Sequence, residues 1–247
     1  MTTSRSRGVR RGLIWAVLGG VIVIAALVMI VLSSVMGQAP TTDPTPTGPA
    51  ANTAPIGSAP PSTTGEYVDV DVTERGWVPE PITADLDVYV RAALAAASTF
   101  DTQLSTRQEW LAHLDTWFTT DTRYTSEQDR EDDMRAARLE LRQGVVLPED
   151  EWNSLANEDG RVTATVPGEI SYQAVPDDAS GDMRIGTADV VLTYTRADNS
   201  GTETSYDETV RVSVQVLCGE GSIPTPNSAQ QPGDCKVVRY FSGSLEG

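Results

Sequence analysis

The segment from Gln108 to Phe118 contains the side chains that come nearest to a catalytic set. It holds His113, the single histidine of the chain, between Glu109 and Asp115. A histidine that bonds to a carboxylate is a common general base in enzymes. On a helix, however, residues two positions apart point in directions about 160° apart, so His113 and Asp115 do not meet. We therefore interpret His113 as lying at the edge of a packed helix face, and the sequence predicts no catalytic residue.

The two cysteines, Cys218 and Cys235, bracket a segment of 16 residues (219–234) that shows no apolar pattern. Two cysteines that flank a hairpin loop outside the cytoplasm are typical of a disulfide. A reactive thiol would need a basic neighbourhood, for which Lys236 is the single candidate. The sequence therefore predicts a structural disulfide between Cys218 and Cys235. Closing a loop of this size contributes about 3 kcal/mol in the chain-entropy model.

Acidic side chains are concentrated between Ser126 and Gly144, where six acids occur from Glu127 to Glu140. A calcium-binding EF-hand loop needs alternating oxygen ligands and a glycine at its sixth position, and no window from Asp121 to Asp133 supplies them. The chain also lacks the C-x-x-C, H-E-x-x-H, P-loop, G-x-G-x-x-G and G-x-S-x-G motifs. The sequence predicts no metal site and no cofactor site.

The charge of the chain is strongly negative and unevenly distributed. The net charge is −17, with 18 basic and 35 acidic residues. Four arginines (Arg5, Arg7, Arg10 and Arg11) are the only charges before Asp43, which leaves 14 bases against 35 acids, a net −21, for the rest. A surface this acidic repels phosphate backbones, so we expect no direct nucleic-acid binding by the acidic part.

Residues 13–36 form an uncharged apolar run of 24 residues, long enough for a helix that crosses a membrane. The arginines of the tail (1–12) place the N-terminus in the cytoplasm and the rest of the chain outside it. A cleaved signal peptide is the alternative, because Gly37–Ala39 is a small-x-small site. The run exceeds the usual length of a signal peptide, and Pro40 follows the site directly, so we prefer an uncleaved anchor. Its small residues are compatible with a homo-oligomer.

After the apolar run, residues 37–65 contain seven prolines and seven threonines and few residues that a core could bury. Such a composition predicts a disordered linker. Residues 66–81 alternate Tyr and Val with acids, which indicates either an edge strand or an extended lead-in. We assign residues 82–247 to one extracytoplasmic α+β domain.

Three helices are expected in the first part of this domain. Apolar residues from Ile82 to Leu104 repeat at helical spacing, which predicts a helix of about 20 residues. Thr106 and Glu109 form a capping-box pattern at the start of a second helix, whose core face comprises Trp110, Leu111, Leu114, Trp117 and Phe118. A third helix is expected over 126–144, with Gly144 at its end.

In the second part of the domain, the sequence pattern predicts strands. Alternating residues predict strands around 162–166, 170–174, 188–194 and 210–216, and a last strand is expected from Lys236 to Gly243. Helices followed by strands that hairpins connect indicate an antiparallel sheet packed on one side by helices.

The chain resembles a group of actinobacterial single-pass membrane proteins. The resemblance lies in the order of an anchor, a spacer, the segments ADLDVYVRAALAAASTFDTQ and STRQEWLAHLDTWFTTDTRY, and the following VVLP. The outer domain of that group looks like the cystatin-like roll, the fold named after nuclear transport factor two. The resemblance covers roughly Pro81 to the C-terminus, and it rests on helix order and the W-L-x-x-L-x-x-x-F pattern at Trp110–Phe118. Similar proteins include scaffold subunits of conjugation and type IV secretion machines and membrane proteins associated with lipid import.

This resemblance implies about three helices on a curved antiparallel sheet of four to five strands. It also implies a non-enzymatic, membrane-anchored scaffold that binds protein partners in a conjugation or secretion apparatus. One alternative is an enzyme or small-ligand-binding roll, which predicts an open cavity lined by an acid and by tyrosines such as Tyr172 or Tyr194. Its carboxyl group would have a raised pKa. The other alternative is an envelope protein associated with a transporter.

Overall fold

The computed structural model describes residues 66–197 and 200–242. The predicted tail (1–12), membrane helix (13–36) and linker (37–65) lie outside the described residues. Within residues 66–197 and 200–242, no helix is both long enough and apolar enough to cross a membrane.

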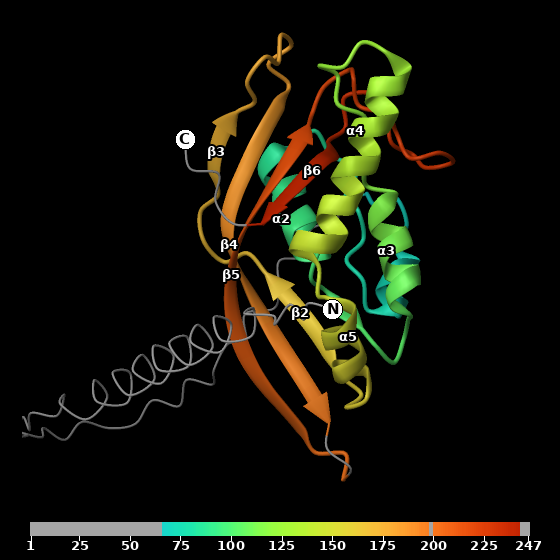
Figure 1. The fold of residues 1–247 in the computed structure, drawn as a ribbon, viewed down its shortest axis with the longest axis vertical. Coiled ribbons are helices and arrows are strands. Elements are labelled where there is room, and N and C mark those ends of the chain that lie inside the picture. The colour runs from blue at the N-terminus through green and yellow to red at the C-terminus, as the bar shows by residue number, and fades with distance from the viewer. Residues whose placement is uncertain (1–65, 198–199, 243–247) are drawn as a thin grey trace, which may run out of the picture. The chain divides into compact units, whose positions relative to one another are not determined.

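The described chain folds into a mixture of helices and one antiparallel sheet (Figure 1). The helical elements are η1 (Asp71–Arg75, a 3-10 helix), α2 (Leu86–Ala96), α3 (Arg107–Asp115), α4 (Glu127–Glu140), η2 (Leu141–Val145, a π-helical turn) and α5 (Glu149–Ala156). The strands are β1 (Phe100–Asp101), β2 (Arg161–Thr165), β3 (Ser171–Ala174), β4 (Met183–Ala197), β5 (Glu203–Leu217) and β6 (Lys236–Ser242).

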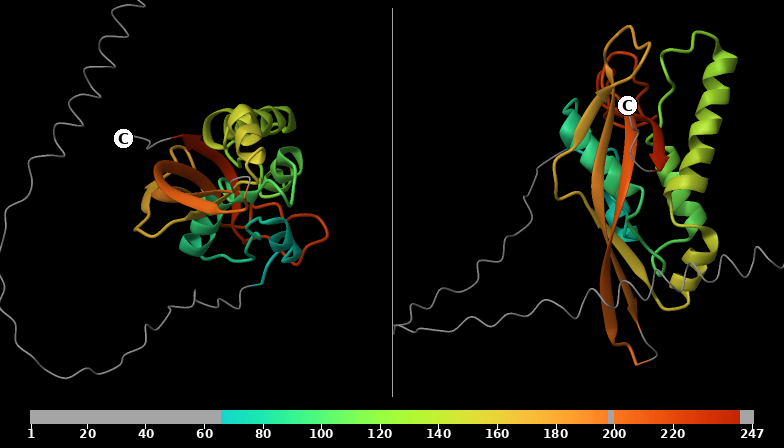
Figure 2. Two further views of the ribbon diagram at one scale, coloured as in Figure 1. Left: turned by 90° about the horizontal axis from the view of Figure 1, so that it is seen from below. Right: turned by 60° about the vertical axis from the view of Figure 1, so that its left-hand side comes forward.

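The sheet is built around two long strands, β4 and β5, of 15 residues each. The strand order is β1-β2-β4-β5-β6, and β3 pairs with β4 beside β2. On one side of the ribbon, β3 pairs with residues 184–187 of β4 and β2 pairs with residues 191–195. On the other side, β6 pairs only with residues 212–217 of β5. The β4–β5 ribbon twists along its length (Figure 2), as long two-stranded ribbons do.

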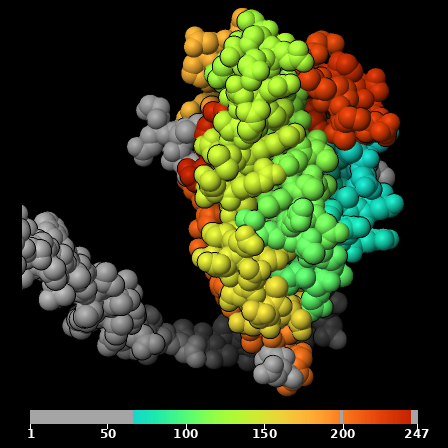
Figure 3. Space-filling view, turned by 45° about the vertical axis from the view of Figure 1, so that its right-hand side comes forward, coloured from blue at the N-terminus to red at the C-terminus, as the bar shows by residue number. Residues whose placement is uncertain are grey.

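The core lies between the sheet and the helices. Helix α2 buries Tyr89, Val90, Ala93 and Leu94 and contacts β2, β4 and β5. A second part of the core is aromatic, because Phe100 of β1 stacks on Trp152 of α5 with ring centroids 4.1 Å apart, and Trp110 of α3 lies 5.5 Å from Trp152. Helices α3, α4 and α5 form one face of the molecule (Figure 3).

Several local predictions are confirmed. Thr106 and Glu109 form the predicted capping box at the start of α3. The side chain of Ser126 caps α4 by accepting the amide of Asp129, and the third helix ends in the π-turn that contains Gly144. The predicted strands correspond to β2, β3, β4, β5 and β6, with β4 and β5 longer than expected.

Two helix predictions are wrong. The first helix has 11 residues, not about 20, because Asp85 caps it by accepting the amides of Asp87 and Val88. At the other end, Phe100 leaves the helix to pair with Val162 of β2. Helix α5 forms between the third expected helix and the first expected strand, where we predicted no helix. Pro148 precedes it, and three acids in its first turn favour a helix N-terminus.

The segment 66–81 is neither a full strand nor simply extended. It contains the 3-10 helix η1, and Tyr67 forms an isolated bridge with Pro81. Trp77 within it is buried and donates from its indole nitrogen to the Ser105 hydroxyl at 2.8 Å. A long-range contact therefore determines the course of this segment.

Candidate functional site

His113 contacts backbone and aromatic groups, and no acid pairs with it among the described residues. Its Nε2 atom lies 3.0 Å from the carbonyl oxygen of Val78, and its ring stacks on Trp77 with centroids 5.0 Å apart. Burial lowers the pKa of His113 below its ordinary value of 6.5, against the opposing charge of Asp69, and this favours the neutral ring. Asp115 instead bonds to Arg142. The structure thus places His113 at the edge of the packed face of α3.

The single lysine of the chain, Lys236, is buried beside Glu80, and each side chain is only 1% exposed. The Lys236 ammonium donates to Glu80 Oε1 at 2.8 Å, to the Thr116 carbonyl at 2.8 Å and to Thr225 Oγ1 at 2.7 Å. The Tyr89 hydroxyl donates to the same Glu80 oxygen at 2.7 Å. Buried charges are tolerated when they are paired and hydrogen-bonded in this way.

Burial determines the direction of both pKa shifts in this pair. It raises the pKa of Glu80, against the opposing attraction of the Lys236 ammonium, and it lowers the pKa of Lys236. We did not predict this pair from the sequence. The only signal was one lysine in a chain whose other bases are arginine, at the start of an apolar strand.

The Glu80–Lys236 pair holds together segments that are distant in sequence. Cys235 is joined to Cys218 by the predicted disulfide, and its amide donates to the Thr83 carbonyl at 2.8 Å. Gln230, in the loop that the disulfide closes, donates to Glu80 Oε1 at 3.3 Å. Figure 3 shows this loop beside the segment that precedes α2. The lead-in, α3 and the loop are therefore fixed to one another by buried polar contacts.

A cavity of about 300 Å³ lies beside the Glu80–Lys236 pair, and we call it the polar cavity. Its lining comprises Val68, Asp69, Glu80, His113, Thr116, Thr225, Pro226, Asn227 and Ser228. One buried carboxylate oxygen, Glu80 Oε2, has no hydrogen-bond partner among the described residues. The second oxygen of the same carboxylate accepts three bonds, so the charge is nevertheless well compensated.

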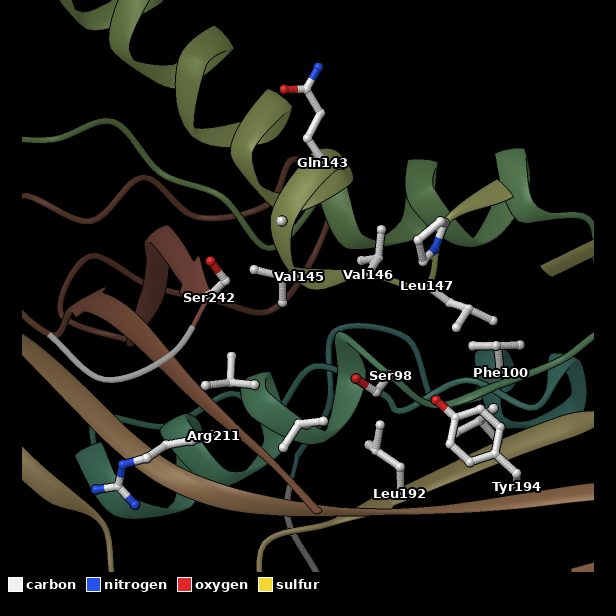
Figure 4. Close-up of a pocket in the computed structure, with 15 residues that line it drawn as sticks. Ser98, Phe100, Gln143, Val145, Val146, Leu147, Leu192, Tyr194, Arg211 and Ser242 are labelled. Atoms are coloured by element: carbon white, nitrogen blue, oxygen red, sulfur yellow. The ribbon is translucent and has the colours of Figure 1, made fainter. Parts of the chain in front are cut away.

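A second hollow, of about 350 Å³, lies between the π-turn η2 and the sheet, and we call it the apolar hollow (Figure 4). It is lined mainly by Phe100, Val145, Val146, Leu147, Pro148, Val162, Leu192, Val210 and Val212, with Ser98, Gln143, Gly144, Tyr194, Arg211 and Ser242 completing the lining. In Figure 4 the Gln143 side chain points away from the strands. The π-turn carries three of the lining residues, and single π-turns in helices are frequent at functional sites.

The two tyrosines named for a cavity enzyme, Tyr172 and Tyr194, lie apart from the carboxyl group with a raised pKa. Tyr194 lines the apolar hollow, but no carboxylate is among the described residues that line it. Tyr172 is on β3, where its hydroxyl donates to Asp87 at 3.1 Å. The carboxyl group with a raised pKa, Glu80, lines the polar cavity instead, where its Oε1 atom accepts bonds from Tyr89 and Lys236. The described residues also contain no group of three or more His, Cys, Asp or Glu residues that could hold a metal ion.

Beside the apolar hollow, β5 has a backbone edge without a partner strand. Residues 203–211 pair with β4, and no described residue pairs with their other side. Tyr206 in this stretch stacks on Tyr194 with ring centroids 5.0 Å apart and planes 6° from parallel, and it is 49% exposed. We call residues 203–211 the open edge. Sequence periodicity predicted a strand around 210–216 but not its extension to Glu203, nor that residues 203–211 would have a partner on one side only within the described chain.

No family model and no curated protein matches the chain. Three solved structures are similar to it. The first is an IcmL-like type IV secretion system protein from Legionella pneumophila, with 10% identity over 66% of this chain and 95% of that chain and a TM-score of 0.38. The second is CagV, a VirB8 homolog of the type IV secretion system of Helicobacter pylori, with 14% identity over 56% of this chain and 82% of that chain and a TM-score of 0.30. The third is a periplasmic fragment of TraM, with 14% identity over 62% of this chain and 90% of that chain and a TM-score of 0.36. Likeness at this level is too remote to assign a function.

Proposed function

We propose that the chain is a membrane-anchored interaction module, a scaffold subunit of a conjugation or secretion apparatus whose domain faces away from the cytoplasm. The observation that carries the interaction role is the open edge of β5 beside the apolar hollow. Unpaired backbone groups next to an apolar recess are suited to binding another polypeptide. The choice of a conjugation or secretion apparatus comes from the resemblance of residues 81–247.

The anchor and the linker complete this proposal. A membrane helix over 13–36 and a flexible linker over 37–65 would hold the domain near the membrane while leaving its surfaces accessible. The disulfide supports a location outside the cytoplasm, since such bonds persist in oxidising compartments. A cysteine introduced into residues 1–12 would be protected from a membrane-impermeant thiol reagent in intact cells. Labelling of that cysteine would contradict the proposed orientation.

The test of the function is affinity purification of the full chain from gently solubilised membranes of its own host. The matched control keeps residues 1–65 and carries an unrelated folded domain in place of the rest. We expect subunits of a conjugation or secretion machine to co-purify with the full chain and not with the control. Transporter subunits in their place would favour the transporter alternative, and a full chain that purifies alone would refute the scaffold function.

The apolar hollow supports one second candidate, a small apolar ligand. Its volume of about 350 Å³ falls within the range of ligand pockets, and most of its lining is aliphatic or aromatic. Native mass spectrometry of the purified chain distinguishes the two functions, because a bound ligand adds a discrete mass that disappears after mild denaturation.

A further inference from the structure

The open edge offers backbone groups over nine residues. Residues 212–217 of β5 are covered by β6, whose last described partner pair is Val212 with Ser242. From Arg211 back to Glu203, only the β4 side of the strand is paired in the described chain. An added strand would therefore continue the line of β6 along β5, and it would form main-chain hydrogen bonds there.

The register of β4 and β5 shows which side chains an added strand would meet. Tyr206 lies opposite Tyr194 and Val210 opposite Val190, which is fully buried, so Tyr206, Glu208 and Val210 share the face that the helices cover. Val210 and Val212 line the apolar hollow, as does Ser242 at the end of β6. Alternate side chains of an added strand would consequently point toward the hollow.

The charge of the open edge limits the kind of strand that fits. It carries Glu203, Asp207 and Glu208 against Arg211, a net charge of −2. Glu203 is already paired with Arg161 and Arg211 with Asp189, so Asp207 and Glu208 are the acids that remain. A second copy of the chain is a poor occupant, because antiparallel self-pairing would bring two edges of the same sign together within a molecule of net charge −17. Basic residues on the strand would instead form opposite-charge pairs across the ladder.

We propose that the open edge and the apolar hollow together accept an extended segment of a partner protein by strand addition, with apolar residues alternating with Lys or Arg. This inference rests on the proposed interaction function and specifies its surface and its partner chemistry. The backbone of β5 provides the hydrogen bonds, and the apolar hollow takes side chains from one face of the segment. On the opposite face, Asp207 is the acid that selects its basic residues.

The probe is a nine-residue peptide in which lysine and valine alternate, with acetyl and amide ends. The control peptide has the same side chains, but the backbone amides of its five central residues are N-methylated and cannot donate hydrogen bonds. Binding to the full chain in detergent is measured by calorimetry. Hydrogen exchange then locates the peptide, and we expect slower exchange of amides within residues 203–211 with the first peptide only.

Two variants test the surface. The exposed double variant Asp207→Lys/Glu208→Lys reverses the charge of the open edge, and Val210→Lys places a charge in the apolar hollow. Each should weaken peptide binding at least ten-fold. Glu131→Lys/Glu169→Lys changes the net charge by the same amount as the first variant, at exposed positions away from the edge, and should bind the peptide within two-fold of the unaltered chain.

Strand addition is refuted if both peptides bind equally, if neither binds, or if the control variant weakens binding as much as the edge variant does. The purification described above tests the interaction function separately. Machine subunits that co-purify equally with the unaltered chain and with Asp207→Lys/Glu208→Lys would preserve the scaffold function and reject this surface. Peptide binding without co-purified subunits would preserve this surface and reject the scaffold function.

Discussion

The two ends of the β4–β5 ribbon differ in how the rest of the described chain covers them. At the end that carries β3 and β6, a disulfide, a buried ion pair and a polar network close the structure around Glu80 and Lys236. At the other end, the same two strands extend past β6, and the first seven residues of β5 are exposed. The chemically reactive groups are thus concentrated where the fold is closed, and the accessible surface is a backbone edge and an apolar hollow.

This contrast bears on function. A lysine, a histidine and a carboxylate near one cavity would suggest catalysis, yet each of them contacts groups that hold segments together. Buried groups that are held by several hydrogen bonds stabilise the fold and have little freedom to move. The polar contacts of the open end are more exposed, as in the Arg161–Glu203 and Arg196–Glu158 ion pairs, and exposed surfaces are available to partners.

The largest expected effect is at the closed end. Lys236→Met leaves the Glu80 carboxylate buried without its cation, which should lower the free energy of unfolding by about 3–5 kcal/mol. Urea denaturation followed by tryptophan fluorescence measures this loss. The paired variant Glu80→Gln/Lys236→Met should recover a large part of it. If Lys236→Met alone is as stable as the unaltered chain, the pair does not hold the closed end together.

Removal of the disulfide should have the next largest effect. Cys218→Ser/Cys235→Ser opens the loop of residues 219–234 and should lower the free energy of unfolding by about 3 kcal/mol, according to the chain-entropy model. Limited proteolysis should then cut within the loop first. Cleavage at the open edge before the loop would show that the polar network holds the loop without the covalent bond.

The open end should tolerate substitution better. Tyr206→Ala removes the stack on Tyr194 and should cost about 1 kcal/mol, as aromatic pairs of this kind typically contribute. Asp207→Lys/Glu208→Lys should change stability by no more than about 1 kcal/mol, because both side chains are exposed and the variant loses one bond, from the Thr193 hydroxyl to Asp207. Chemical denaturation of these two variants beside Lys236→Met compares the ends directly. A decrease of about 3 kcal/mol in the free energy of unfolding for either open-end variant would show that the open end is as sensitive to substitution as the closed end.

The smallest expected effect is a dependence of stability on pH at His113. Its folded pKa is lowered by burial, so its contribution to stability is complete above pH 6.5 and is lost as the pH falls through the folded pKa. Because the chain has one histidine, a single imidazole resonance reports its titration. His113→Asn should flatten the decline of stability below pH 6.5. A titration above pH 6.5 would indicate an acidic partner for the ring.

The amino-acid sequence by itself determined the features that depend on neighbours a few residues away. The capping box of Thr106 and Glu109, the cap at Ser126 and the alternation in β5 follow from local hydrogen bonding and side-chain period. The cysteine pair was predicted for a similar reason, since it closes one short loop.

Only the tertiary structure decided features that depend on distant segments. Helix α2 is short because Phe100 pairs with β2 and packs on Trp152, a residue about 50 positions away, and α5 forms where it can bring that tryptophan to the core. Lys236 is buried because Glu80, 156 residues earlier, meets it. Within the described chain, β6 covers only residues 212–217 of β5, while β4 and β5 continue as a pair beyond them. Local pattern shows that a strand forms, but the number of its neighbours depends on where the rest of the chain packs.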